Sequence, residues 1–301
     1  MNIFIGTSGW SYPEWKGIVY PNNLPQSKMF QYYQEFFYTT EINSTFYQIP
    51  TIKSAQNWAE KSNSMFKFSA KIPDIVTHKS KLNLDECVTP LSDFINSMTP
   101  LIASKKLIAF LLQLPPKFGN KGESDYILLK KFASHWEKNI KESLYSRDYQ
   151  PPNLVVEFRN AYWLNEENID ETFNLLQDYD FSYCSVVEPL LPPILRTTSK
   201  SLFYIRFHGY GKKPWFNYNF TNSELEEWAY KLKPILNDVL KEKTEKRKAV
   251  LYFNNHFSGY AIKNALYLAK LLNIPVRNKA SNLKKPFNIL LKSQSSIDDY
   301  L

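Results

Sequence analysis

The sequence predicts a single-domain (β/α)8 barrel of the TIM type. Eight short apolar or alternating segments, rich in β-branched and aromatic residues, recur along the chain with segments of helical periodicity between them. A strand that is repeatedly followed by a helix implies a parallel sheet, because each parallel neighbour needs a crossover connection. Eight such repeats favour closure into a barrel, and a length of 301 residues suits one barrel domain.

The predicted strands alternate with predicted helices through the barrel. We expect strands at Asn2–Gly6, Thr39–Asn43, Phe66–Lys71, Leu107–Gln113, Asn153–Phe158, Phe181–Val187, Leu202–His208 and Ala249–Asn254. We expect helices at Ser27–Phe37, Ile52–Ser62, Pro90–Ser104, Ser124–Tyr145, Asn165–Asp178, Ser223–Lys241 and Gly259–Leu272. Within one domain, 1–301, the barrel core is assigned to residues 1–278 and a polar tail to 279–301.

Local signals mark some of the element boundaries. The segment Glu188–Lys200 after the sixth strand contains three prolines, so a loop with little helix is expected there. Ser124, and either Thr221 or Asn222, stand before acidic first turns and are expected to cap two helices.

The charge balance raises the expectation of an anionic partner. Lys and Arg total 37 against 29 for Asp and Glu, which gives a net charge of +8. Much of the excess lies in dispersed lysines such as Lys243 and Lys246, which are typical of a solvated helix end rather than of a nucleic-acid stripe. With 44% hydrophobic and 16% aromatic residues, the chain can bury a sizeable core and is not expected to be disordered.

The cysteines and the apolar runs predict a cytoplasmic protein. Cys87 and Cys184 are the two cysteines and form no CxxC pair, so neither a disulfide framework nor a thiolate metal site is indicated. The start of the sequence lacks a basic segment followed by a long apolar one, and no run of about 20 apolar residues follows later. We therefore expect no export signal and no membrane partner.

Polar side chains gather near the C-terminal ends of the predicted strands, on one face of each strand. Alternate residues share a face, so Glu157 lies with Arg159 and Arg206 lies with His208, while apolar neighbours face the helices. The complete inward set consists of Glu41, Asn43, Ser69, Lys71, Gln113, Glu157, Arg159, Arg206, His208, Tyr252 and Asn254. Barrel enzymes place their catalytic groups at this end.

Two interpretations of this polar set are open. The charges can form an ion-pair network that fixes the barrel mouth, or they can hold a ligand. Unpaired polar groups are costly to bury, so their convergence requires mutual hydrogen bonds, a ligand or both. The size of the set favours a ligand site.

We predict chemical roles for twelve of these and neighbouring residues. His208 suits a general acid or base because the unperturbed pKa of histidine is about 6.5. A pair of glutamates can divide acid and base work if their environments separate their pKa values, and a lysine can neutralise charge or form a Schiff base. The predicted catalytic residues are Glu41, Glu157, His208 and Lys71. The predicted substrate-binding residues are Ser8, Trp10, Asn43, Tyr47, Gln113, Arg159, Arg206 and Asn254.

Two loops and a set of aromatic residues add further candidates. The turn Gly6-Thr7-Ser8-Gly9 suits either close approach by a ligand oxygen or a tight βα turn. The loop 209–218 interleaves aromatic residues with Lys212 and Lys213, and loops after strands seven and eight often hold phosphate in barrels, although solvated surface lysines give the same pattern. Aromatic residues near strand ends form either a stacking wall or a cover for the core: Trp10, Tyr12, Trp15, Tyr47 and Trp163, of which Trp10 and Tyr47 are the preferred ligand contacts.

No cofactor is predicted, and metal binding is disfavoured. Of His78, His135, His208 and His256, only His208 is placed in the predicted mouth, which leaves a multinuclear metal site without ligands. A single Mg²⁺ or Mn²⁺ on Glu41 and Glu157 stays open as an alternative, although the surrounding cations oppose it.

Ordered motifs run from the first predicted strand to the eighth. They are IGTSGWSYPEWKG at 5–17 followed by YP at 20–21, EINSTFY at 41–47 followed by Pro50, FKF at 66–68 with Lys71 and Thr77-His78, QLPP at 113–116, EFR at 157–159 with Trp163, YIRFHG at 204–209 and YFNN at 252–255. This set resembles the YecE-like family, catalogued as domain of unknown function 72. The resemblance implies a TIM-type barrel but supplies no activity, and likeness in shape to sugar isomerases or endonuclease IV-type barrels is analogy.

Three hypotheses for function follow. The first is a metal-independent enzyme, a hydrolase or lyase, that acts on an anionic sugar-phosphate or nucleotide-like substrate at the barrel mouth. The second is a nucleic-acid-binding or repair barrel, favoured by the basic balance and aromatic loops. The third is a ligand sensor that uses the same mouth without turnover. The sequence carries no signal of the oligomeric state.

Overall fold

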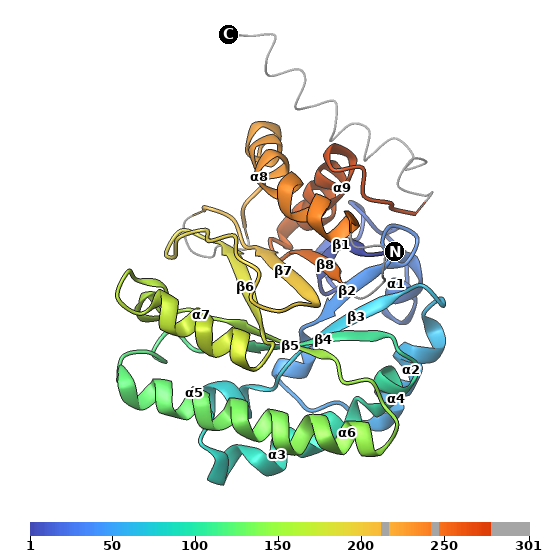
Figure 1. The fold of residues 1–301 in the computed structure, drawn as a ribbon. Helices are drawn as coiled ribbons and strands as arrows, with labels where there is room; N and C mark the ends of the chain where they lie inside the picture. Colours follow the sequence, from blue (N-terminus) through green and yellow to red (C-terminus); the bar gives the residue numbers. More distant parts are fainter. Residues whose placement is uncertain (212–216, 242–246, 278–301) are drawn as a thin grey trace.

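Eight parallel strands form a closed barrel in a computed structural model that describes residues 1–211, 217–241 and 247–277 (Figure 1). Each strand pairs with its neighbours in sequence, and β8 pairs with β1 to close the sheet. The strands are β1 (Ile3–Ser8), β2 (Thr39–Ile42), β3 (Lys67–Lys71), β4 (Leu107–Gln113), β5 (Asn153–Glu157), β6 (Ser182–Val187), β7 (Leu202–Phe207) and β8 (Lys248–Phe253). The predicted barrel and its eight strands are confirmed.

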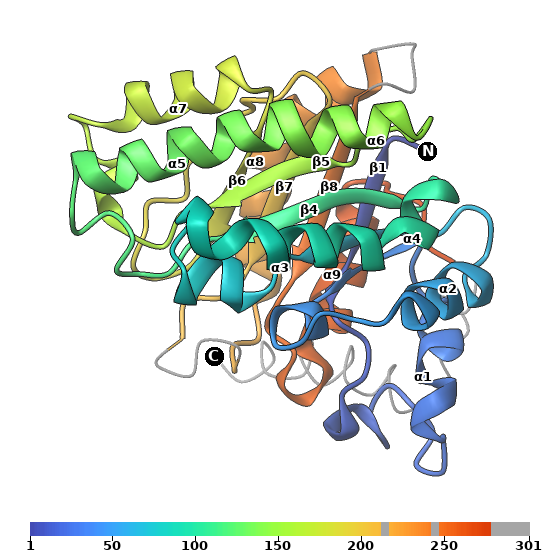
Figure 2. The ribbon, with the colours of Figure 1, turned by 90° about the horizontal axis from the view of Figure 1, so that it is seen from below.

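Helices lie around the outside of the strands (Figures 1 and 2). The α-helices are α1 (Gln26–Tyr33), α2 (Ile52–Lys61), α3 (Leu84–Ser97), α4 (Thr99–Ala103), α5 (Glu123–His135), α6 (Glu142–Ser146), α7 (Ile169–Asp178), α8 (Asn222–Lys241) and α9 (Tyr260–Leu271). Shorter helical turns are η1 (Pro13–Trp15), η2 (Ser44–Phe46), η3 (Ile75–Lys79), η4 (Trp136–Lys141), η5 (Ala161–Leu164) and η6 (Phe257–Gly259). No helix in the described ranges is both long and apolar enough to cross a membrane.

Several strand ends differ from the prediction by one or two residues. The β1 strand continues to Ser8, and His208 and Asn254 follow their strands instead of ending them. Both still donate one backbone hydrogen bond to the neighbouring strand, His208 to Val187 (2.9 Å) and Asn254 to Phe207 (2.8 Å). The alternation of faces therefore extends past the last regular pair.

Two helix starts and one helix cap were predicted wrongly. The helix expected from Asn165 begins at Ile169. The helix expected from Pro90 begins at Leu84, where the Asn83 side chain accepts a hydrogen bond from the Asp85 backbone N–H (3.3 Å), and Pro90 lies inside it. Proline is a strong start signal, but the capping side chain upstream decides the boundary. Ser124 does not cap α5, because that helix begins one residue earlier, after Gly122.

Two other local predictions are confirmed. Thr221 caps α8 in a reciprocal arrangement: its hydroxyl accepts from the Glu224 backbone N–H (3.2 Å), and the Glu224 carboxylate accepts from the Thr221 backbone N–H (2.8 Å). The segment Glu188–Lys200 forms neither helix nor strand. The predicted tail 279–301, the lysines Lys212 and Lys213, and Lys243 and Lys246 lie outside the described residues.

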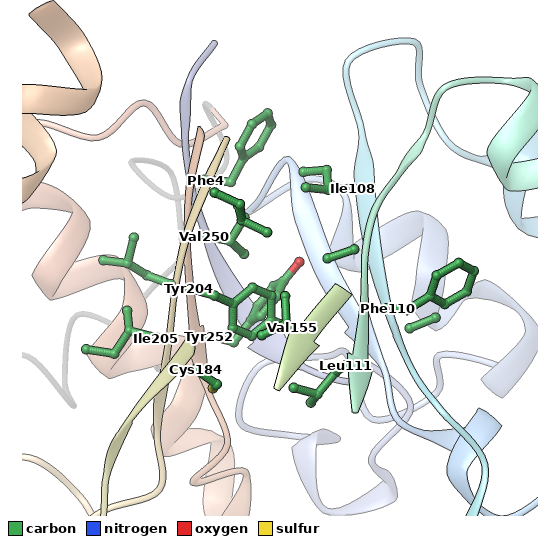
Figure 3. Close-up of a cluster of buried hydrophobic side chains, with 14 of the residues drawn as sticks. Phe4, Ile108, Phe110, Leu111, Val155, Cys184, Tyr204, Ile205, Val250 and Tyr252 are labelled. Carbon is green, nitrogen blue, oxygen red and sulfur yellow. The ribbon is translucent and has the colours of Figure 1, made fainter. Parts of the chain in front are cut away.

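The barrel interior is filled by side chains below the mouth. Figure 3 shows Tyr204 and Tyr252 pointing into the barrel, whereas Ile205 and Phe110 point toward the helix layer. The two tyrosine rings meet edge to face at 5.5 Å, and the Tyr252 hydroxyl is hydrogen-bonded to Thr39 Oγ1 at 2.6 Å. Because large buried rings occupy the centre, space for a ligand remains only toward the strand ends.

Gly6 is required by the approach of β1 to β2. A Cβ atom at this position would lie 2.4 Å from the Thr39 backbone oxygen, so the close neighbour of this glycine is the protein's own backbone. We expect Gly6→Ala to lower the free energy of unfolding by about 1–3 kcal/mol, measured by urea denaturation. An unchanged urea midpoint would show that β1 and β2 can move apart without a loss of stability.

Candidate active site at the mouth of the barrel

A cavity of about 970 Å³ opens at the C-terminal ends of the strands. Residues at the ends of seven of the eight strands line it, all except β6. Those predicted site residues that line the cavity are Trp10, Asn43, Tyr47, Lys71, Gln113, Arg159, Arg206, His208 and Asn254. This volume is within the range that accommodates a small metabolite.

The floor of the site is an arginine held between two glutamates. Arg206 Nη2 lies 2.7 Å from Glu41 Oε1, and Arg206 Nη1 lies 2.5 Å from Glu157 Oε2. All three side chains are at most 1% exposed. Burial alone would raise the pKa of Glu157, but Arg206, His208 and Arg159 hold it well below its usual range. The same carboxylates raise the pKa of Arg206 despite its burial.

The remaining carboxylate oxygens are also paired. Tyr204 donates its hydroxyl to Glu41 Oε2 (2.6 Å), while Gln113 Nε2 and Arg159 Nη1 donate to Glu157 Oε1 (2.6 and 3.0 Å). A network in which every carboxylate oxygen has a partner orders its members and lowers the penalty of buried charge. Neither glutamate lines the cavity, so a ligand meets the donors first. The acid–base role of the two glutamates stays a prediction.

The position between the two carboxylates is taken by a guanidinium group. A divalent cation bound to both Glu41 and Glu157 would have to occupy the same space as Arg206. Within the described part of the chain, no three His, Cys, Asp or Glu side chains are grouped so that they could hold a metal ion.

Lys71 lies in the cavity wall with a neutral partner. Its Nζ donates to Gln113 Oε1 at 2.6 Å and stands 3.7 Å from the centre of the Phe46 ring. Burial, followed by the charge of Arg206, lowers the pKa of Lys71 to about 7, although Glu157 and Glu41 oppose the shift. The amine is therefore present in charged and neutral forms at neutral pH.

His208 is held as a neutral imidazole. Asn254 Nδ2 is 3.1 Å from His208 Nδ1, and because the amide nitrogen can only donate, Nδ1 accepts and the ring proton resides on Nε2. Nε2 points to Glu157 Oε1 at 3.6 Å. Burial lowers the pKa of His208 to about 4, even though Glu157 opposes this shift. The side chain therefore does not titrate near pH 6.5, as the sequence led us to expect. At neutral pH the ring can accept a proton.

The structure adds Glu188, which sequence reasoning missed. Its carboxylate pairs with Arg159 Nη2 at 3.0 Å, and burial raises the pKa of Glu188 to about 7. Glu188 follows β6 and shares a face with Cys184, whose Sγ lies 3.9 Å from Glu157 Oε2. The rule of alternate faces, applied to β6, would have found it. The residues of β6 carry no charge, and the prolines after Glu188 indicated a loop, so Glu188 was not among the predicted site residues.

The predicted aromatic residues divide between the cavity and the core. Trp10, Tyr12 and Tyr47 line the cavity, and Tyr47 is 80% exposed. Trp15 and Trp163 are fully buried, where their indole N–H groups donate to His256 O (2.6 Å) and Phe118 O (2.9 Å). These aromatic residues therefore divide between the cavity and the core, with Trp10 and Tyr47 on the cavity side, and their contact with a ligand stays a prediction.

Three further histidine and aromatic side chains join the cavity wall: Phe46, His78 and His256. His78 packs edge to face on Phe46 at 4.9 Å, and His256 stacks on Tyr12 at 4.3 Å. Both histidines follow strand ends by several residues, where alternation along a strand no longer predicts direction.

Ser8 is the predicted binding residue that the structure does not bring to the cavity. It is fully buried, and its Oγ has no hydrogen-bond partner among the described residues. Its backbone oxygen accepts the Tyr12 hydroxyl. Nearby, Thr7 Oγ1 donates to Gly9 O (2.6 Å), so this hydroxyl serves the turn. The turn reading of Gly6-Thr7-Ser8-Gly9 is favoured over ligand binding.

The fold and the buried ion-pair floor define a barrel protein with a preformed polar site. Comparison with family models identifies residues 4–287 as a match to "Protein of unknown function DUF72", and the chain belongs to this family. The UPF0759 protein YunF of Bacillus subtilis is 25% identical over 292 residues, covering 90% of this chain and 95% of that protein. The UPF0759 protein YecE of Escherichia coli K12 is 28% identical over 117 residues, 39% of each chain.

Solved structures of the same family share the architecture. A DUF72 family protein of Thermotoga maritima superposes with a TM-score of 0.70 at 27% identity, covering 91% of this chain and all of that chain. A DUF72 family protein of Enterococcus faecalis superposes with a TM-score of 0.72 at 23% identity, covering 91% and 96%. These comparisons establish the family and the fold. The names of the relatives state no reaction.

The charge of Arg206 is expected to dominate the stability of the floor. Arg206→Met leaves two buried carboxylates without a counter-charge, so we expect a loss of about 3–5 kcal/mol in unfolding free energy by chemical denaturation. Adding Glu41→Gln and Glu157→Gln to that variant should restore part of the loss, because the uncompensated charge is removed. The control is Lys231→Met, which breaks an exposed pair (2.5 Å) with Glu227 and should change stability by less than about 1 kcal/mol. Equal losses of unfolding free energy in Arg206→Met and Lys231→Met would contradict this explanation.

The lowered pKa of His208 predicts loss of stability in mild acid. The unfolded chain takes up a proton near pH 6.5 whereas folded His208 does so near pH 4, so this stabilisation is present above pH 6.5 and lost as pH falls toward 4. The loss attributable to His208 is on the order of 3 kcal/mol. His78 titrates in the same window because burial lowers its pKa to about 4. We therefore compare wild type with His208→Gln: the variant's urea stability should fall less steeply between pH 6.5 and 4, and parallel curves would refute the assignment.

Proposed function

We propose that this chain is an enzyme that binds an anionic sugar-phosphate or nucleotide-like compound in the mouth cavity and cleaves it, as a hydrolase or lyase, without a resident metal ion. The observation that carries this proposal is the charge of the cavity wall. Lys71, Arg159 and Arg206 line the cavity, and no aspartate or glutamate is among the described residues that do so. The carboxylates that balance these cations lie behind them.

This arrangement presents positive charge to a ligand without a large net charge. Glu41, Glu157 and Glu188 offset the three cations from the protein side and fix their positions. Donors that are already oriented, in a site with restricted water, stabilise an anion more strongly than flexible surface lysines do. The geometry therefore supports recognition of phosphate or carboxylate at the cavity floor.

Two cavity groups are suited to proton transfer near neutral pH. The pKa of Lys71 is lowered to about 7, and His208 is neutral with its pKa lowered to about 4 by burial. An amine that titrates near neutral pH can donate or accept a proton, and the neutral imidazole can accept one. Trp10 and Tyr47 at the rim offer flat surfaces for a sugar or a base above these groups.

We further propose that the protein works in the cytoplasm. Cys87 and Cys184 are both buried free thiols, which suits a reducing compartment.

The enzyme proposal is tested by a turnover screen with phosphorylated sugars and nucleotides, read by mass spectrometry of the small molecules. We expect turnover by wild type and a fall of at least about a hundred-fold in Lys71→Met and in His208→Gln, because each removes a proton-transfer group. Lys130→Met, which changes a separate surface cleft, is the matched control and should retain activity.

The alternatives give different results in the same samples. Tight binding of an anion with no turnover would support a ligand sensor and overturn the enzyme. Salt-sensitive affinity for DNA or RNA, with none for mononucleotides, would support a nucleic-acid-binding barrel. Full activity in both variants would remove Lys71 and His208 from the mechanism.

A further inference from the structure

The position of Lys71 is set by a chain of fixed hydrogen bonds. Gln113 Nε2 donates to Glu157 Oε1 at 2.6 Å, so the amide cannot turn over and its Oε1 must face Lys71 Nζ, also at 2.6 Å. An amide oxygen can accept a hydrogen bond from an ammonium group and also from a neutral amine. The partner of Lys71 therefore orients the nitrogen without requiring that it stay charged, as a carboxylate would.

The charged groups that face Lys71 come from several strands and carry both signs. Arg206 on β7 and Arg159 after β5 disfavour the ammonium form, while Glu157 and Glu41 favour it. The charge of Lys71 in turn helps to lower the pKa of His78 on η3, which is neutral near pH 7. Both glutamates are already bound by Arg206. Next to the amine, the Phe46 ring at 3.7 Å closes one side, so the free side of Nζ is the cavity.

Lys106 is a partly buried lysine with a structural role, and it serves as a comparison for Lys71. Burial also lowers the pKa of Lys106, but its Nζ donates to Ala59 O (2.6 Å), Ser62 O (2.8 Å) and Ser62 Oγ (2.8 Å). Three acceptors use all its hydrogens, and it does not line the cavity. Lys71 has one such acceptor and an open side.

We infer that Lys71 is a nucleophile that forms an imine with the carbonyl group of an anionic aldehyde or ketone, and that the cleaved bond is a carbon–carbon bond beside that carbonyl. This inference rests on the proposed function and narrows it to a lyase. The ligand's phosphate or carboxylate pairs with the arginines of the floor, and its carbonyl carbon lies against Nζ. An amine nucleophile in a desolvated site beside other cations is a recognised route to such chemistry.

The steps balance without an oxidant. The neutral amine adds to the carbonyl carbon, a nitrogen–carbon bond forms, and a proton moves from nitrogen to oxygen to give a carbinolamine. Uptake of one proton and loss of water leaves an iminium ion. The adjacent carbon–carbon bond of a β-hydroxy carbonyl compound then breaks: its electron pair forms an enamine, and the hydroxyl proton passes to Nδ1 of neutral His208 once that nitrogen releases its hydrogen bond with Asn254. Protonation of the enamine carbon and hydrolysis of the imine release the second product and restore Lys71.

The test is reductive trapping on the whole wild-type protein. Dihydroxyacetone phosphate, glyceraldehyde 3-phosphate and pyruvate are each incubated with the protein and sodium cyanoborohydride, which reduces an imine to a stable secondary amine. Peptide mapping by mass spectrometry then locates the adduct. We expect labelling at Lys71 and none at Lys106, which serves as the control within the same molecule. Neutral dihydroxyacetone should need about ten-fold higher concentration, because it lacks the charge-assisted contacts.

The pH profile separates this lysine from ordinary ones. The neutral amine reacts, and its fraction grows as pH rises through the pKa, so labelling of Lys71 should increase with a midpoint near pH 7 and then level off. Exposed lysines should still be gaining reactivity toward pH 10. Labelling at Lys71 that followed the exposed lysines would overturn the inference.

Failure of this inference is distinguishable from failure of the proposed function. Calorimetric titration with inorganic phosphate reports whether the cavity binds an anion, independently of any covalent step. Phosphate binding with no Lys71 adduct from any of the three compounds overturns the imine and leaves the proposed function standing. Absence of both binding and adduct overturns both. Lys71→Met should abolish the adduct while keeping phosphate binding through Arg159 and Arg206, whereas an adduct that persists on another residue overturns the inference.

Discussion

The contact on which the site depends is the buried guanidinium of Arg206 between Glu41 and Glu157. These residues come from β7, β2 and β5, so the contact crosses the barrel interior and links strands that are not neighbours. Taking three charges out of water is unfavourable unless each is paired and hydrogen-bonded. Tyr204, Gln113 and Arg159 supply the other hydrogen bonds to the two glutamates and hold them in place.

The unusual protonation states at the mouth have one physical origin. Lys71 and His208 are both buried near Arg206, and burial followed by that positive charge opposes a second cation in the same place. Glu188 responds to burial in the opposite sense, which raises its pKa. A replacement of the ion-pair floor by apolar side chains would often be no less stable, so stability alone does not account for it. The proposed ligand, which would contact the oriented cations, supplies the second reason.

Much of the site was predictable because parallel strands impose a simple rule. Once β5 and β7 were located, alternation placed Glu157 with Arg159 and Arg206 with His208, and closure of the sheet brought them together. The rule failed where side chains follow a strand by several residues, as for His78 and His256. The same rule also places Glu188 on the inward face after β6, but the proline-rich segment that starts there indicated a loop. Ser8 obeys the alternation, but it lies below the cavity.

By itself the sequence determined the barrel, its family and the identity of the inward polar side chains, because strand periodicity and motif order are properties of the chain. Only the tertiary structure decided which of those side chains line the cavity. Burial placed both glutamates behind the arginine and left Lys71, Arg159 and His208 in the wall. Such depth depends on contacts between residues far apart in sequence, and so does the protonation state that follows from it.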